Sequence, residues 1–117
     1  MSSAVREAAR GVLRERFGFD DFHALQGDAV EHVLEGGDAL VLMPTGGGKS
    51  ICFQLPALVL PGLTIVISPL IALMQDQVEA LLRKGIDATY INSSLGRDER
   101  ERRLEDVVAG RYDLIYV

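Results

Sequence analysis

The chain has 117 residues, of which 48% are hydrophobic and 25% are charged, and its formal net charge at pH 7 is −5. This length fits one domain at most, and the composition is ordinary for a soluble globular protein. Every apolar run is far shorter than the ~18–20 residues of a membrane helix, which excludes a membrane span, and the N-terminus lacks the apolar core of a secretion signal. A lone cysteine, Cys52, fits the reducing interior of a cell. The acidic balance by itself argues mildly against a nucleic-acid partner.

The first half of the chain predicts two amphipathic helices and then a strand. The helices cover about residues 4–16 and 24–34, and Gly36 and Gly37 close the second. The apolar run at 39–43 predicts a strand that leads into a glycine-rich turn. Another helix is expected directly after this turn.

From residue 62 onward, strand and helix patterns alternate. The expected elements are a strand at 64–68, a helix from Pro69 to a cap at Gly85, a strand at 88–91, a helix from Arg97 to Ala109 and a strand at 113–117. The apolar residues of each helix recur at the spacing of one buried face. They are Leu70, Leu73, Met74, Val78, Leu81 and Leu82 in the first helix, and Leu104, Val107 and Val108 in the second.

This alternation predicts an α/β fold with a mostly parallel sheet flanked by helices. Ligands of such sheets bind beyond the carboxyl ends of the strands, where the polar or glycine-rich segments 44–50, 68–69 and 92–94 are expected to converge. The chain ends on Val117 inside a strand pattern, which indicates a domain that is incomplete at its C-terminus.

The glycine-rich turn has the features of a phosphate-binding loop. Its residues are Pro44, Thr45, Gly46, Gly47, Gly48, Lys49 and Ser50. Glycines allow backbone N–H groups to approach an anion, and the N-terminus of the next helix adds further donors. Lys49 is suited to the terminal phosphates of a nucleotide, and the Ser50 hydroxyl is suited to Mg²⁺. The alternative is a glycine-rich turn that only separates two elements, but the order of strand, turn, Lys-Ser and helix favours the phosphate loop.

A second segment, upstream of this loop, carries groups suited to a base. The Gln26 amide can pair with the N6 and N7 edge of adenine, and an aromatic ring such as Phe17 or Phe22 can stack on it. By itself this signal is weak, because a glutamine at the start of a helix is more often solvated.

Together these segments resemble the RecQ family of DNA helicases. The family's motif 0, L-x₃-aromatic-G-x₃-F-R-x₂-Q, is matched over about residues 13–26 by Leu13, Phe17, Gly18, Phe22 and Gln26. The phosphate loop at 43–50 reads M-P-T-G-G-G-K-S as the family favours, with Met43 where the strict Walker A pattern has glycine, and residues 68–78 resemble motif Ia. The resemblance covers nearly the whole chain.

The resemblance implies a fold, an activity and roles for individual residues. The fold would be a P-loop NTPase, a RecA-like α/β/α sandwich of which residues 1–117 form the N-terminal portion of the first domain. The activity would be ATP-dependent 3′-to-5′ unwinding of single-stranded or forked DNA in recombination and repair, in the cytoplasm at the nucleoid. Gln26 would read adenine beside Phe17 or Phe22, residues 43–50 would hold ATP through Lys49 and Mg²⁺ through Ser50, and Ser68, Pro69, Asn92 and Ser93 would lie near DNA. A common turn or cap is the alternative for these last four residues.

One departure qualifies what the resemblance implies. His23 stands where the family has arginine, which implies weaker or more pH-dependent nucleotide binding. The charged run at 97–103 is expected to be a solvated helix face with Asp98–Arg102 and Glu99–Arg103 pairs, and not a DNA-binding patch.

The sequence also lacks groups that ATP hydrolysis needs. The family supplies a D-E-x-H motif after the strand that follows this segment, and it supplies arginines from a second RecA-like domain. Neither occurs in residues 1–117. We therefore expect the chain alone to be inactive as an ATPase. The alternatives are a non-catalytic or degenerate nucleotide-binding fragment and, with less support, a DEAD-box-like RNA helicase, whose usual G-S-G-K-T loop differs from the one found here.

Overall fold

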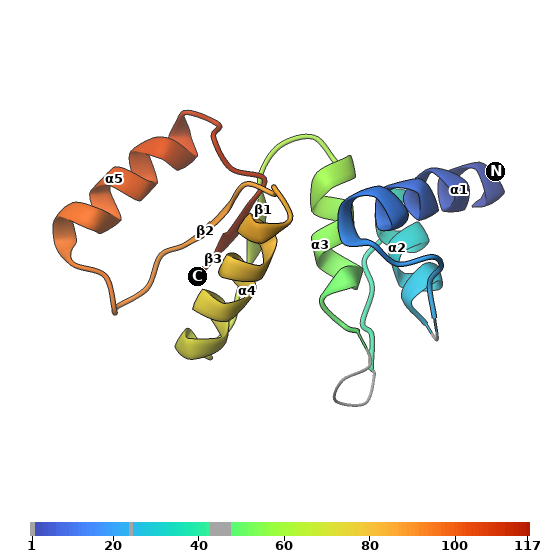
Figure 1. Cartoon of the computed structure of the whole chain (residues 1–117), viewed down its shortest axis with the longest axis horizontal. Coiled ribbons are helices and arrows are strands. Elements are labelled where there is room, and N and C mark those ends of the chain that lie inside the picture. The colour runs from blue at the N-terminus through green and yellow to red at the C-terminus, as the bar shows by residue number, and fades with distance from the viewer. Residues whose placement is uncertain (1, 24, 43–47) are drawn as a thin grey trace. The chain divides into compact units, whose positions relative to one another are not determined.

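A computed structural model describes residues 2–23, 25–42 and 48–117. The chain divides into two compact units, Met1–Pro61 and Gly62–Val117. Figure 1 draws helices α1 to α3 in the first unit, and a sheet with helices α4 and α5 in the second. Each unit has its own set of buried side chains.

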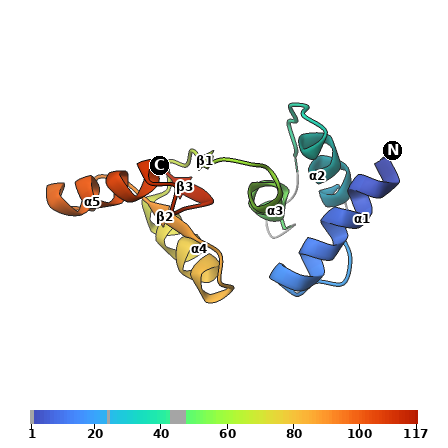
Figure 2. The same cartoon turned by 90° about the horizontal axis from the view of Figure 1, so that it is seen from above.

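The first unit consists of packed helices. Helix α1 (Ser2–Val12) continues into a π-helical turn, η1 (Leu13–Phe17), and Gly18 ends it with a φ of +79° that favours glycine. Helices α2 (Gln26–Leu34) and α3 (Ile51–Val59) follow, and both contact α1 (Figure 2). The helices predicted from the sequence in this part are therefore confirmed. The apolar core of the unit consists of Ala9, Leu13, Phe17, Ala29, Val30, Ile51, Leu55 and Ala57.

The strand predicted at 39–43 is wrong for its described residues, 39–42, which belong to no helix or strand. Leu40 is 90% exposed and Leu42 is 81% exposed. A strand is stable only where neighbouring backbone pairs with it, and among the described residues sheet pairing involves β1, β2 and β3 alone. The apolar pattern marks residues that could enter a sheet, but it does not supply their partner.

The second unit alternates strands with helices, as predicted. Its elements are β1 (Thr64–Val66), α4 (Ile71–Arg83), β2 (Ala88–Tyr90), α5 (Arg97–Val108) and β3 (Leu114–Tyr116). The sheet order is β1-β3-β2 and both pairings are parallel, with Leu114 opposite Thr64 on one side and opposite Ala88 on the other. A central parallel strand is covered on both faces, and all three residues of β3 are buried. The α/β class with a parallel sheet flanked by helices is confirmed.

The predicted buried faces of the two helices are only partly right. Met74, Val78 and Leu81 of α4 are buried, at the spacing that lets one narrow stripe contact the sheet. The predicted core positions that are instead exposed by 43% or more are Leu70, Leu73, Leu82, Leu104 and Val108. Helix α5 has no buried residue.

Polar contacts attach α5 to the sheet in place of an apolar face. The Arg103 guanidinium lies 4.6 Å from the centre of the Tyr90 ring, and its Nη1 donates to the Tyr90 carbonyl at 2.8 Å. A long arginine side chain therefore makes the contact that Leu104 and Val108 were expected to make.

Candidate nucleotide-binding site

The Gln26 side chain joins the segment predicted to bind the base to the loop predicted to bind phosphates. Gln26 is the first residue of α2, and only 3% of its surface is exposed. Its Nε2 donates to the Gly48 carbonyl at 2.9 Å, and its Oε1 accepts from the His23 backbone N–H at 3.1 Å. The Gln26 backbone N–H donates in turn to the His23 carbonyl, also at 3.1 Å. Both ends of the amide are therefore held, and each has capacity for one more hydrogen bond.

Gly48 has two separate reasons to be glycine. Its φ is +77°, a conformation that L side chains rarely adopt. A Cβ at this position would also lie 2.3 Å from Gln26 Nε2 and 3.4 Å from the His23 ring. The close approach of Gln26 to the loop thus depends on the missing side chain.

Lys49 and Ser50 form the turn that starts α3. The N–H groups of Ile51 and Cys52 donate to the carbonyls of Gly48 and Lys49, at 3.3 and 3.1 Å. Lys49 is exposed, and Ser50 occupies the N-cap with helical φ and ψ of −63° and −31°. The other predicted loop residues, Met43, Pro44, Thr45, Gly46 and Gly47, lie outside the described residues.

The chemistry of these two residues fits a Mg²⁺-bound polyphosphate. A serine at an N-cap usually accepts a hydrogen bond from the first turn, but Ser50 makes no such side-chain bond. Its hydroxyl oxygen is therefore not used for capping, and a hydroxyl oxygen is a suitable Mg²⁺ ligand. Among the described residues, no group of three or more His, Cys, Asp or Glu side chains could hold a metal ion. Phosphate oxygens would be further ligands of a cation that Ser50 holds.

The three aromatic rings of the upstream segment have different surroundings. Phe17 is buried in the core, with 7% of its surface exposed, and Phe22 is half-buried. Phe19, which the sequence analysis did not single out, is 52% exposed. Phe19 directly follows Gly18, the residue that ends the helix. Its position in a loop was the sequence feature that could have predicted its exposure. Phe22 and Phe19 can therefore meet a planar ligand with less rearrangement than Phe17.

Lys49 also borders a small apolar cavity in the first unit. The cavity has a volume of about 300 Å³, and apolar residues of α2, of the segment before the loop and of α3 form most of its wall. Cys52 is part of this wall, and burial raises the pKa of its thiol. Lys49 is the only charged side chain among the described residues that line the cavity, so the rest of the wall offers a phosphate no charged donor.

In the second unit, Ser68 and Pro69 follow β1 at the carboxyl edge of the sheet. The Ser68 N–H donates to the Val117 carbonyl at 2.9 Å, which extends the pairing of β1 with β3. The Ser68 hydroxyl accepts from the Leu70 N–H at 3.2 Å. The Ser68 side chain thus forms the strand-to-helix turn that the sequence left open as an alternative.

Asn92 and Ser93 follow β2 at the same edge. Asn92 Oδ1 accepts from the Ser94 N–H at 2.8 Å and from the Ser94 hydroxyl at 2.5 Å, and its Nδ2 donates to Met74 Sδ at 3.4 Å. Asn92 therefore fixes the loop, while Ser93 is exposed. The structure brings residues 68–69 and 92–94 to one sheet edge, as expected, whereas the predicted phosphate loop belongs to the other unit.

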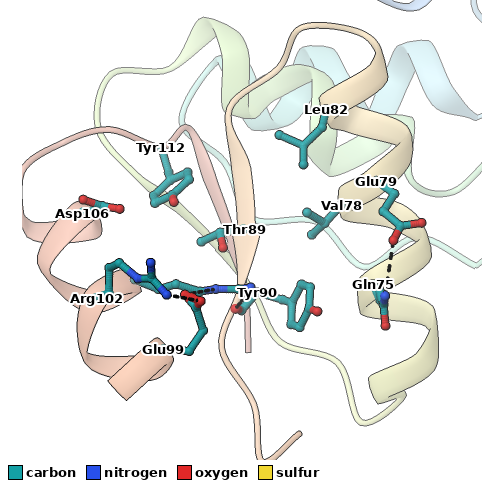
Figure 3. Close-up of a pocket in the computed structure, with 11 residues that line it drawn as sticks. Gln75, Val78, Glu79, Leu82, Thr89, Tyr90, Glu99, Arg102, Asp106 and Tyr112 are labelled. Carbon is teal, nitrogen blue, oxygen red and sulfur yellow. Dashed lines mark hydrogen bonds and ion pairs between the residues drawn. The ribbon is translucent and has the colours of Figure 1, made fainter. Parts of the chain in front are cut away.

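A groove of about 470 Å³ lies between α4, β2 and α5 (Figure 3). Arg102 Nη2 donates to Glu99 at 2.5 Å and Arg103 Nε to the same carboxylate at 3.4 Å, while Glu79 and Asp106 add further negative charge. The predicted Glu99–Arg103 pair is confirmed, but Arg102 pairs with Glu99 and not with Asp98. The groove is not a cationic patch for DNA, because carboxylates offset both arginines.

None of the helices in the described ranges is long and apolar enough to cross a membrane.

Comparison with known proteins gives consistent results. Residues 23–117 match the DEAD/DEAH box helicase family. The chain is 46% identical over 114 residues to the ATP-dependent DNA helicase RecQ of Synechocystis, and 48% identical over 110 residues to the RecQ of Bacillus subtilis. It is 49% identical over 109 residues to the ATP-dependent helicase SGS1 of Saccharomyces cerevisiae.

These alignments cover 97%, 93% and 90% of the chain, respectively. The chain spans only 24%, 19% and 8% of the length of these relatives. The resemblance to RecQ helicases that the sequence motifs indicated is confirmed, and it concerns a limited part of each relative.

Proposed function

The chain belongs to the DEAD/DEAH box helicase family, its relatives include RecQ DNA helicases, and we propose that it is the ATP-binding part of such a helicase. The observation that carries this proposal is the hydrogen bond of 2.9 Å from Gln26 to Gly48. It connects the segment suited to adenine with the loop suited to phosphates inside one compact unit. ATP carries both an adenine base and a chain of phosphates.

Each site residue then has a defined role. Gln26 keeps one amide hydrogen and one lone pair for adenine after its contacts with Gly48 and His23, and Phe22 provides the adjoining wall. Lys49 binds the terminal phosphates, and Ser50 ligates the Mg²⁺ that accompanies them. Mg²⁺ supplies charge neutralisation on the phosphates when it is bound.

Unwinding of DNA belongs to the longer protein in this proposal. The segments after β1 and β2, with Ser68, Pro69, Asn92 and Ser93, lie at one sheet edge and would face single-stranded or forked DNA. Hydrolysis requires a carboxylate that holds Mg²⁺, which the chain after β3 would supply. It also requires an arginine worth about 10³–10⁵ in rate, which a second RecA-like domain would supply. We expect the protein to act where DNA is found, in the cytoplasm at the nucleoid.

Calorimetric titration with ATP and Mg²⁺ tests the binding function directly. Lys49→Ala is expected to weaken ATP binding by about tenfold or more, because it removes the mobile charge suited to the terminal phosphates. Lys84→Ala is the matched control, since Lys84 is the other lysine of the chain, is exposed and lies just after α4 in the second unit. Equal ATP affinity in the unchanged and the Lys49→Ala chains would reject the proposed role of the loop.

The non-catalytic alternative makes a different prediction for the longer protein. A helicase would hydrolyse ATP in a DNA-stimulated reaction that Lys49→Ala abolishes. A nucleotide-binding module would bind ATP with the same dependence on Lys49 and release no phosphate. The 117-residue chain alone is expected to bind ATP without turnover in both cases.

A further inference from the structure

Three arginines lie four residues apart along the first helix of the chain. Arg6 and Arg10 belong to α1, and Arg14 belongs to η1, which continues it. Residues spaced by four lie on the same side of a helix, so the three guanidinium groups extend from one face. Each of them contacts the chain between residues 20 and 31, which contains Gln26.

Arg6 holds the segment that follows Gln26. Its Nη2 donates to Asp28 Oδ1 and to Glu31 Oε2, each at 2.8 Å. The Arg6 and Glu31 side chains are 29% and 14% exposed, so this pair is partly shielded from water. Gly27 leaves room for the guanidinium, since a Cβ there would lie 2.8 Å from Arg6 Nη1. Arg6 therefore lies directly against the residue after Gln26.

Arg10 and Arg14 hold the segment that precedes Gln26. Arg10 Nε donates to Asp21 Oδ1 at 2.8 Å, and Arg10 also pairs with Glu7. The same Asp21 oxygen accepts from the Phe22 backbone N–H at 2.8 Å. Arg14 Nε donates to the Asp20 carbonyl at 2.7 Å. These contacts fix the loop between Gly18 and α2 from the side of the first helix.

The three arginines therefore contact the segment that precedes Gln26 and the segment that follows it. The Gln26 amide reaches Gly48 with Nε2 and the His23 backbone with Oε1, and both contacts depend on where the loop and the start of α2 are placed. A hydrogen bond loses most of its strength when its geometry is disturbed, so small shifts of these segments change what the amide can bind.

We propose that Arg6, Arg10 and Arg14 form an arginine ladder that positions Gln26 and thereby sets the recognition of the nucleotide base. This inference rests on the proposed ATP-binding function. The three arginines are positioning residues, because their contacts are with the protein segment around Gln26. The ladder controls affinity for the base and leaves the binding of phosphates to the loop.

The test compares ATP with inorganic tripolyphosphate, both with Mg²⁺, on the 117-residue chain by calorimetric titration. Tripolyphosphate has the phosphates of ATP but no base. Arg6→Gln is expected to weaken ATP binding by about tenfold and tripolyphosphate binding by less than about twofold. The matched control is Arg100→Gln, which removes an exposed arginine from α5 in the second unit and should change neither affinity.

Two milder variants keep the proposal testable if Arg6→Gln does not fold. Gly27→Ala displaces the Arg6 guanidinium without changing any charge, while alanine favours the helix. Asp21→Asn removes the charge that faces Arg10, and its amide oxygen can still accept from the Phe22 N–H. Each is expected to weaken ATP binding by about threefold, with tripolyphosphate binding unchanged, since partly exposed pairs contribute less than buried ones.

The Gln26→Ala background separates positioning from general destabilisation. If the ladder acts through Gln26, Arg6→Gln should weaken ATP binding in the unchanged chain and have almost no effect in the Gln26→Ala chain. Unchanged ATP affinity in the folded ladder variants, or equal losses for ATP and tripolyphosphate, overturns the ladder proposal while the Lys49 dependence stands. Absence of ATP binding by the unchanged chain overturns the proposed function and the ladder together.

Discussion

The two units are stabilised by different kinds of contact. In the second unit, β3 pairs with a strand on each side and all of its residues are buried, while α5 is attached by polar side chains. In the first unit the described residues form no strand, and long side chains connect its helices and loops through Arg6, Arg10 and Gln26. Backbone pairing depends little on which side chains are present, whereas the candidate site depends on a few individual groups. Substitutions in the sheet of the second unit should therefore change mainly the stability, and substitutions around Gln26 should change mainly the binding of ATP.

The largest expected effect is on the stability of the second unit. Leu114→Ala removes a fully buried side chain from the central strand and should lower the free energy of unfolding by about 2–5 kcal/mol, measured by urea denaturation. The matched control is Leu104→Ala on α5, where the side chain is 50% exposed and the expected loss is less than about 1 kcal/mol. Equal losses at the two positions would show that α5 packs an apolar face after all, and the contrast between the units would weaken.

Gly48→Ala tests whether ATP binding in the first unit depends on the contact between Gln26 and Gly48. Gly36 also has a positive φ, +91°, but a Cβ there meets no atom within 4 Å. Backbone strain of roughly 1–2 kcal/mol is expected for alanine at either position. Only Gly48→Ala also pushes Gln26 off the loop, so it alone should weaken ATP binding, by about tenfold in a calorimetric titration. If Gly36→Ala weakens ATP binding equally, strain and not the Gln26 contact accounts for the loss.

Periodicity was sufficient to predict the elements of the second unit. The strands and helices there lie where alternation, β-branched runs and terminal glycines placed them, because each signal is local. The buried stripe of Met74, Val78 and Leu81 also follows from helical spacing. Leu82 and Leu104 were predicted wrongly, since an apolar residue at the right spacing is buried only if another element covers it.

The candidate site was only partly predictable. The motifs made Gln26, Lys49 and Ser50 candidates by their chemistry, but nothing local indicated that Gln26 would touch Gly48, 22 positions away. The arginine ladder had a usable signal in its spacing of four residues, yet the carboxylates that it contacts around Gln26 are 11 to 25 positions distant. The strand predicted at 39–43 shows the same limit, because strand formation requires a partner that the pattern cannot specify.

The smallest expected effect concerns the acid stability of the first unit. The hydrogen bond from Arg10, and after it that from the Phe22 N–H, lowers the pKa of Asp21 below its usual value of about 3.9. A carboxyl whose pKa is lower in the folded state stabilises the fold above its ordinary pKa, and this contribution is lost as the pH falls through the lowered value. Asp21→Asn should therefore make the melting temperature less sensitive to pH below about 4, followed by circular dichroism. The same substitution should have a smaller effect in an Arg10→Gln chain, because the main cause of the shift is then already absent. An equal effect in both backgrounds would mean that Asp21 responds to other groups and that Arg10 does not hold the loop before Gln26.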